Sequence, residues 1–172
     1  MPEIDTNLIE NKLPEFSKHF SSNILEVQDH RGDLTVVLSP SSIRQAISFL
    51  KEKLNFEMLL DIFAMDYSKF EPAPLERFAV IYNLYSLSQK RRVRLKVFLK
   101  EENPQVDSVH DLYSSANWFE REAWDLFGIN FLGHPHLTRI LCHNEFEGHP
   151  LRKDYPSDGY QQLRKASTSL GI

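Results

Sequence analysis

Short runs of apolar residues, separated by turn-forming residues, predict five β-strands in the first hundred residues. Residues 23–38 predict a hairpin, in which Gly32 supplies the positive φ angle of a tight turn. Residues 58–65 are apolar enough for a buried strand, and residues 78–100 predict a second hairpin. A loop containing two prolines separates them. Because a sheet with an apolar face must bury it against another layer, the pattern restricts the chain to layered folds.

Two segments have helical spacing instead. The first covers residues 9–20, where Pro14 is expected to kink the helix or restart it. The second begins with Ser39 and Pro40, which are typical of an N-cap and a first helical residue, and its apolar stripe continues to Leu54. These helices are the expected covering layer of the sheet.

The order of the elements predicts an α+β fold with two layers. It reads helix, strand, strand, helix and three strands, followed by short helices and an extended C-terminal arm. One of these helices is expected over residues 109–113, with Ser108 as its cap. A chain of 172 residues suits one domain, which we expect to cover residues 1–156. The polar residues 157–172 predict a tail that either is flexible or orders along a partner.

The composition argues against several classes of function. A formal net charge of −4 disfavours a general nucleic-acid or anionic-membrane binder. The basic strand within residues 90–100 is the local exception, and we expect a solvated sheet face, a protected edge or a surface for an acidic protein, with RNA or anionic lipid as alternatives. One cysteine allows no internal disulfide and no ordinary four-cysteine iron–sulfur cluster. Neither a signal peptide nor a membrane span is expected.

Motifs for nucleotide binding or nucleophilic catalysis are absent. The six glycines are too far apart for a dinucleotide or phosphate loop, so no bound cofactor is expected. One possible function is that of a free-standing metal-dependent enzyme. It would use five potential ligands within 16 residues: His134, His136, Cys142, His143 and His149. Their spacing matches no established zinc pattern. The two His-Pro pairs fit loops in which the imidazole bonds a backbone carbonyl.

A charged segment near residue 120 predicts one more helix, over residues 118–127. Asn117 and Glu120 are expected to begin it as a capping box, and Gly128 to end it in a left-handed turn. At about 100° per residue, Glu120 falls within the apolar sector, and the other flank carries Arg121, Glu122 and Asp125. Acid–base chemistry needs such carboxylates in a cleft, and the sequence places none there.

Two blocks of residues carry a family resemblance. The first runs from Glu120 to Leu141 and has the pattern ERExxDxFGIxFxGHPxLxRIL. The second is Gly148 to Pro156, with the sequence GHPLRKDYP. Together they resemble the 30-kDa-type (C-type) subunit of the proton-pumping NADH:quinone oxidoreductase, respiratory complex I. The resemblance extends from about residue 24 to residue 156 and implies the same α+β architecture.

The resemblance implies a non-redox subunit of the peripheral arm that docks to the 49-kDa-type (D-type) subunit. The complex passes electrons from NADH through FMN and iron–sulfur clusters to quinone and pumps protons. This chain would bind none of these cofactors and contribute no catalytic residue. Its expected place is the cytoplasmic side of a bacterial cell membrane, or the matrix side in an organelle, held there by its partners. The equivalent subunit of a related quinone reductase or membrane-bound hydrogenase is the alternative.

Arginine and aromatic side chains are favoured at protein interfaces, and both blocks are rich in them. We therefore expect the docking surface to include Trp118, Glu120, Arg121, Glu122, Asp125, His134, Arg139, Arg152, Lys153, Asp154 and Tyr155. One tryptophan is expected to point inward and the other outward. Charge reversal at Arg121 or Arg139 is expected to impair assembly more than folding.

Overall fold

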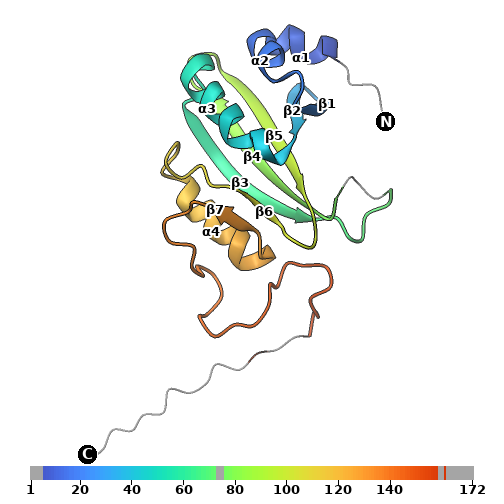
Figure 1. Cartoon of the computed structure of the whole chain (residues 1–172), viewed down its shortest axis with the longest axis vertical. Helices are drawn as coiled ribbons and strands as arrows, with labels where there is room; N and C mark the ends of the chain where they lie inside the picture. Colours follow the sequence, from blue (N-terminus) through green and yellow to red (C-terminus); the bar gives the residue numbers. More distant parts are fainter. Residues whose placement is uncertain (1–5, 73–75, 159–160, 162–172) are drawn as a thin grey trace, which may run out of the picture.

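The computed structural model describes residues 6–72, 76–158 and 161 of the chain (Figure 1). Most of the predicted tail therefore lies outside the described residues, as does part of the predicted proline loop. In the part of the chain that is described, no helix has both the length and the apolar character needed to cross a membrane.

Five strands form one mixed sheet, in the order β1-β2-β5-β4-β3. The strands are β1 (Ile24–His30), β2 (Asp33–Leu38), β3 (Met58–Asp66), β4 (Phe78–Ser86) and β5 (Arg91–Leu99). Neighbouring strands are antiparallel except β2 and β5, which run parallel. Both predicted hairpins are confirmed, and the β2–β5 pairing joins them into one sheet.

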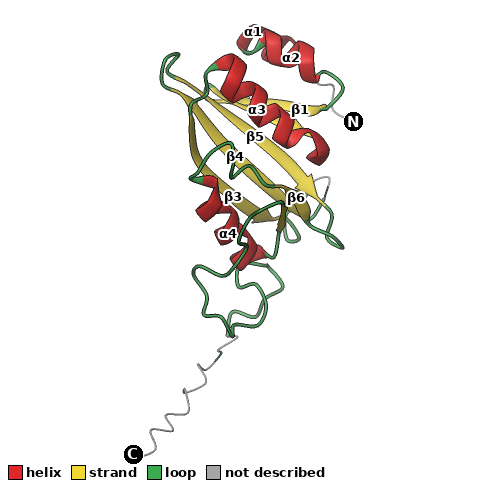
Figure 2. Ribbon diagram, turned by 60° about the vertical axis from the view of Figure 1, so that its left-hand side comes forward, coloured by secondary structure: helices red, strands yellow, loops and turns green. Residues whose placement is uncertain are grey.

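The helices of the first half cover one face of this sheet (Figure 2). They are α1 (Thr6–Lys12), α2 (Pro14–Phe20), the short 3-10 helix η1 (Pro40–Ser42) and α3 (Ile43–Leu54). The first helix restarts at a proline, as predicted, because proline lacks the N–H that would continue the hydrogen-bond ladder. The two-layer α+β prediction is confirmed.

The main hydrophobic core lies between the sheet and these helices. Its largest fully buried side chains include Phe16, Ile43, Leu50, Phe78, Tyr82 and Leu95. The opposite face carries no helix among the described residues and holds only a small apolar cluster centred on Val37 and Ile81. One face of the sheet therefore packs on the core, and the other is covered by its own side chains and by no helix of the described residues.

Two predictions about individual strands were wrong. Strand β3 is an edge strand and is not fully buried, since Met58, Leu60 and Phe63 are each about 40% exposed. Strand β5 is the central strand, so the protected-edge alternative for its basic residues was wrong, while the alternatives of a solvated face and of a surface for an acidic protein remain. Its Arg94 and Lys96 are half-buried because they lie across the open face against neighbouring side chains.

The last regular elements are β6 (Gln105–Asp107), α4 (Ala116–Phe127) and β7 (Asn130–Leu132). Helix α4 packs against β3, and β6 pairs with β7 in parallel. The predicted helix over residues 109–113 is instead a hydrogen-bonded turn at Val109. The two three-residue strands were missed because so short a segment shows no periodicity.

After β7 the chain forms an irregular loop, residues 133–158, which we call the C-terminal loop. It contains no helix or strand and extends beyond α4, away from the sheet (Figure 1). A loop of this length without secondary structure is uncommon in a compact domain and is usually functional or disordered. The contacts that fix this one are therefore the centre of the candidate site.

Candidate functional site

Asp125 of α4 organises the first half of the C-terminal loop. Its side chain is fully buried, and one carboxylate oxygen accepts the backbone N–H groups of Ile140 (3.0 Å), Leu141 (2.8 Å) and Cys142 (2.9 Å). The other oxygen accepts a bond of 2.5 Å from the guanidinium of Arg139. Burial opposes ionisation, but these donors outweigh it and lower the pKa of Asp125 to about 2.

Two arginines extend this arrangement. Arg139 also donates to the carbonyls of Phe146 (2.6 Å) and Gly148 (3.3 Å), and its guanidinium lies over the ring of Trp124 at 5.7 Å. Arg121 donates to the carbonyls of Thr138 (3.1 Å) and Arg139 (3.0 Å). The carbonyls of an irregular loop need donors, and here the arginine side chains supply them.

The second half of the loop caps the C-terminal end of α4. The His149 Nδ1 atom lies 3.0 Å from the carbonyl of Asp125, the Leu151 N–H donates to the carbonyl of Leu126, and Arg152 donates to the carbonyl of Phe127. The last carbonyls of a helix have no partner within the helix, and their negative end attracts cations. The two sequence blocks therefore bind each other.

Gly128 makes this contact possible. Its φ angle is +73°, so it ends α4 in the predicted left-handed turn. A side-chain carbon placed here would lie 2.5 Å from both Arg152 Nη2 and His149 Nε2. Glycine is therefore favoured here for two reasons: its backbone angle and the close approach of the loop.

A third contact fastens the loop to the sheet. Asp66, at the end of β3, is buried and accepts hydrogen bonds from Arg77 (2.9 and 3.2 Å) and from the backbone N–H of Lys153 (2.9 Å). Arg77 also pairs with Asp154 at 2.9 Å. Burial opposes ionisation of Asp66, yet Arg77 and the N–H donors hold its pKa well below the usual range. Sequence reasoning missed Asp66 and Arg77 because they lie well before the resembling blocks, on β3 and just ahead of β4.

A separate buried chain of polar groups begins at Glu120, in the first half of α4. The Glu120 carboxylate is fully buried and accepts bonds from Ser108 Oγ (2.5 Å) and the Val109 N–H (2.7 Å). Ser108 Oγ in turn lies 3.0 Å from His110 Nδ1. The predicted capping box is therefore wrong: Glu120 bonds a distant turn, and Ser115 occupies the N-cap without a side-chain bond.

Comparison with known proteins identifies the family. A family model described as the 30-kDa subunit of respiratory-chain NADH dehydrogenase matches residues 36–161, well over half of the chain. The chain belongs to this 30-kDa subunit family. The C-type subunit of NADH-quinone oxidoreductase from Geotalea uraniireducens is 45% identical over 140 residues, which cover 81% of this chain and 83% of that protein.

The family extends to mitochondrial proteins. NADH dehydrogenase [ubiquinone] iron-sulfur protein 3 from Candida albicans is 42% identical over 154 residues, which cover 88% of this chain and 51% of that protein. Among solved structures, a trypsin-resistant fragment of Nqo5 has a TM-score of 0.67 and 36% identity, covering 75% of this chain and 98% of the fragment. A chain of an archaeal membrane-bound sulfane sulfur reductase shares the fold, with a TM-score of 0.72 and 24% identity, covering 86% of this chain and 85% of that one.

Most residues predicted for docking in this family member have partners within the chain. Glu120 and Asp125 are fully buried, and four more use their polar side-chain atoms internally: Arg121, His134, Arg139 and Arg152. Asp154 pairs with Arg77, Lys153 donates its backbone N–H to Asp66, and the Tyr155 hydroxyl accepts a bond from Gln161. Among these docking residues, three have exposed side chains for which the described residues show no such bond: Trp118, Glu122 and Lys153. These contacts assign the motif residues a structural role whatever else they do.

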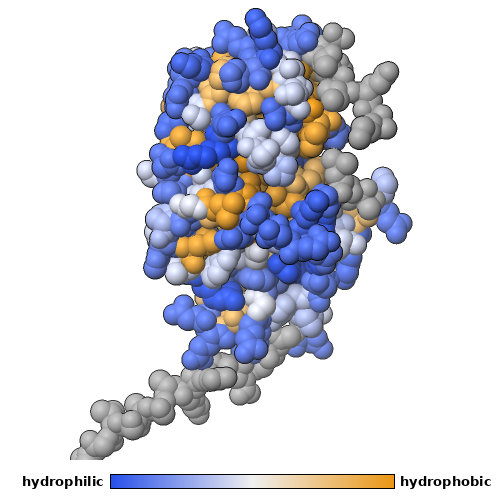
Figure 3. Space-filling model, in the orientation of Figure 1, coloured by the Kyte–Doolittle hydropathy of each residue, from blue (hydrophilic) through white to orange (hydrophobic). Residues whose placement is uncertain are grey.

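The tryptophans divide as predicted. Trp118 is 60% exposed, and the guanidinium of Arg121 lies 5.2 Å from its ring centre. Trp124 packs partly buried against the core. Hydrophobic residues lie among hydrophilic ones over the area formed by α4 and β7 (Figure 3). Of the two tryptophans, Trp118 is therefore the one whose ring is exposed.

The histidines do not converge on a metal. The described residues contain no group of three histidine, cysteine or acidic side chains close enough to hold one. His134 Nε2 lies 3.2 Å from the carbonyl of Asn117, and His149 bonds the carbonyl of Asp125. Both His-Pro pairs therefore lie in loops with the imidazole against a backbone carbonyl, as predicted.

Glu120 gives the chain a distinctive pH dependence. Burial raises its pKa to about 7, against the opposing bonds from Ser108 and Val109. The folded chain therefore keeps a proton that the unfolded chain releases near pH 4.5. The free energy of unfolding should fall as pH rises from about 4.5 to about 7, by about 3 kcal/mol at most, given about 1.4 kcal/mol per pKa unit.

Urea unfolding at several pH values measures this effect, with a Glu120→Gln variant as the comparison. Glutamine keeps an acceptor for Val109 and a donor for Ser108 but does not titrate. The variant should lose the decline between about pH 4.5 and about pH 7. An equal decline in both proteins would show that Glu120 is already ionised in the folded chain.

Proposed function

We propose that this chain is the 30-kDa-type subunit of a proton-translocating NADH:quinone oxidoreductase, and that it docks to the 49-kDa-type subunit in the peripheral arm. Its contribution to electron transfer is structural: it holds partners in the geometry that transfer from NADH through FMN and iron–sulfur clusters to quinone requires. It carries no catalytic residue. Its partners hold it at the cytoplasmic face of a bacterial membrane, or at the matrix face in an organelle.

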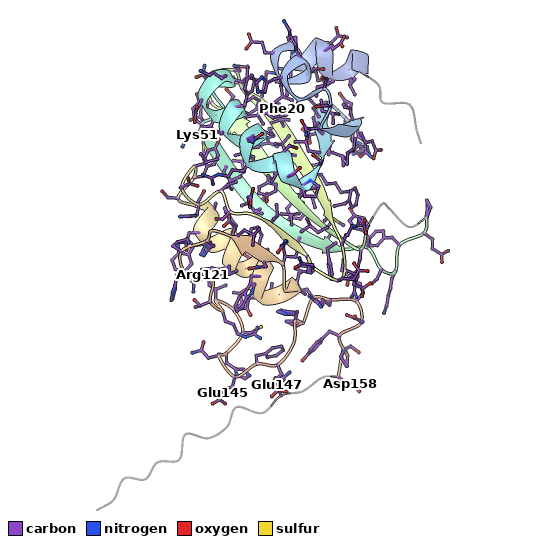
Figure 4. All side chains as sticks on the ribbon, viewed as in Figure 1. Phe20, Lys51, Arg121, Glu145, Glu147 and Asp158 are labelled. Carbon is purple, nitrogen blue, oxygen red and sulfur yellow. The ribbon has the colours of Figure 1, made fainter. Side chains whose placement is uncertain are left out.

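The observation that carries this proposal is the anchored C-terminal loop. A loop without secondary structure is held by three anchors, at Asp125, at the end of α4 and at Asp66. Ordering the loop before binding lowers the entropy cost of association. Figure 4 shows Glu145, Glu147 and Asp158 along its outer edge, away from the sheet. We assign docking to this preorganised surface.

Exposed apolar side chains on and beside the loop supply the contact area. Leu141 is 62% exposed and belongs to the backbone that Asp125 holds. Leu151, 48% exposed, lies where the loop caps α4. Trp118 adds a large aromatic surface on α4. Because interfaces are built around such side chains with a polar rim, Leu141 and Leu151 join Trp118 in the proposed docking set.

The name of the Candida albicans relative refers to iron and sulfur, and this chain offers no ligand set for an ordinary cluster. A cluster is ordinarily held by four cysteine thiolates, and Cys142 is the single cysteine. Burial and the nearby Asp125 carboxylate raise the pKa of the Cys142 thiol, which disfavours the thiolate that a metal needs. We therefore place the redox cofactors in the partner subunits.

Leu141→Glu tests the docking surface. Association with a co-expressed 49-kDa-type partner should weaken by about tenfold or more, because a charge would be buried at an apolar contact. Melting of the isolated variant should change little, since the side chain is exposed. Pull-down and calorimetry measure the two quantities.

Leu87→Glu is the matched control, because Leu87 is 56% exposed in the turn after β4, remote in sequence from the loop. It should leave association with the 49-kDa-type partner unchanged. If both substitutions weakened association equally, or if neither weakened it, the C-terminal loop would not be the docking surface.

A further inference from the structure

A cavity lies at the other end of the sheet, remote from the C-terminal loop. Because β2 and β5 are parallel, the turns that precede them lie at the same end, at the top of Figure 1. The end of α1 joins them, since Lys12 bonds the carbonyl of Gly32 and Arg91 bonds the carbonyl of Lys12. Three segments distant in sequence therefore meet around one cavity.

The cavity has a volume of about 490 Å³, which lies in the usual range of ligand sites. Its lining includes three apolar residues, Leu13, Leu34 and Phe56, which are buried and form its floor. A second cavity of about 240 Å³ adjoins it and shares Asp33, Leu34 and Arg92. The two make a groove that continues from the end of the sheet onto strand β5, and we call it the β5 groove.

The walls of the β5 groove carry an excess of positive charge. Lys12 is neutralised by Asp29, but Lys90, Arg91 and Arg92 have no carboxylate partner among the residues that the structure describes. Arg94, in the second cavity, bonds the neutral side chains of Asn83 and Thr35. The acidic residues of the lining are Asp33, which both cavities share, and Asp61 in the second cavity, and the cations outnumber them. This local charge is opposite to the net charge of −4 of the whole chain.

We propose that the β5 groove binds an extended acidic segment of a partner protein. Its unpaired cations suit carboxylates, and its apolar floor suits intervening hydrophobic side chains, so the lining matches a peptide of mixed acidic and apolar residues. A nucleic acid fits less well, because the aromatic rings of the described lining are not free to stack on bases: Tyr85 lies beneath Arg92, and Phe56 is buried. The groove is separate from the C-terminal loop, so neither proposal depends on the other.

Fluorescence anisotropy with the full chain tests this directly. The probe is a labelled peptide of about twelve residues in which glutamate alternates with leucine and alanine, and its glutamine counterpart is the neutral comparison. The acidic probe should bind at least about tenfold more tightly than the neutral one, and its binding should weaken as salt rises. Amide chemical shifts should change at residues 31–34 and 90–94, and shifts confined to other residues would contradict the proposal.

A Lys90→Glu/Arg92→Glu variant should reduce binding of the acidic probe by at least about tenfold. A Lys18→Glu/Lys53→Glu variant changes exposed lysines on α2 and α3, alters the net charge equally, and should bind as the parent does. Circular dichroism confirms that both variants remain folded. Equal binding by parent and groove variant would overturn the proposal. Two other results would also overturn it: a uridine oligonucleotide, or vesicles containing about one-fifth phosphatidylserine, binds the chain more tightly than the acidic peptide does, and only the groove variant loses this binding.

Discussion

Replacing Asp125 with alanine is expected to destabilise the chain by about 4 kcal/mol or more. The substitution leaves Arg139 as a nearly buried cation without its carboxylate, and breaking such a pair typically costs about 3–5 kcal/mol. It also removes the acceptor of three consecutive backbone N–H groups, each of which costs free energy when left unpaired. Against a typical domain stability of about 5–15 kcal/mol, this is a large fraction.

Urea unfolding measures the loss, and limited proteolysis locates it. Cleavage should appear first between residues 139 and 148, because this backbone depends on Asp125 and Arg139. Glu122→Ala is the matched control, since Glu122 is exposed on the same helix and should shift stability by less than about 0.5 kcal/mol. An Asp125→Ala variant as stable as the control would mean that the loop is held by other contacts.

The same geometry changes what we expect of Arg139. The sequence alone favoured a docking role, with charge reversal harming assembly more than folding. Its side chain bonds Asp125 and two loop carbonyls. Charge reversal should therefore unfold the loop, and any loss of assembly should follow from that unfolding. Arg121 bonds loop carbonyls beside exposed Trp118, and the docking expectation still applies to it.

Gly128→Ala is expected to cost about 3 kcal/mol. A left-handed φ angle strains any residue with a side chain by about 1 kcal/mol or slightly more. The added methyl group would also lie 2.5 Å from the side chains of His149 and Arg152, so these side chains must shift from their contacts with the end of α4. Overpacking of this kind typically costs about 1–3 kcal/mol.

Gly133→Ala separates the two contributions. Gly133 has a φ angle of +80°, but nothing lies within 4 Å of the position that a side-chain carbon would occupy. This variant should lose only about 1 kcal/mol in urea unfolding, the cost of the backbone angle. If both variants lost the same amount, the close approach of the loop to Gly128 would contribute nothing to stability.

The regular elements of the first hundred residues were predictable because their signals are local. Helix α3 has a continuous apolar stripe, and both hairpins have apolar runs on either side of turn residues. Edge or central position in the sheet is not local, because it depends on which strands pair. Nothing within β3 or β5 records which strands will pair with them, so the buried position expected for β3 and the edge position considered for β5 were both wrong.

The candidate site shows the same division. Helical periodicity placed Glu120 in the apolar sector of its helix, and the structure confirms its burial. The capping box was the wrong explanation, because Ser108 and Val109, 11–12 residues earlier, supply the donors. Asp125 was assigned to a polar flank, yet it is buried because the loop returns 15–17 residues later and covers it.

The sequence by itself determined the family, the two-layer α+β architecture and the two blocks from which most of the candidate site is built, because motif identity and apolar periodicity are properties of short segments. Only the tertiary structure decided what those residues touch. A buried carboxylate and a docking carboxylate look alike in a sequence, since the difference is whether another part of the chain reaches them. Here the second block of residues closes over the first, and the charges that the motif displays are used to hold that loop in place.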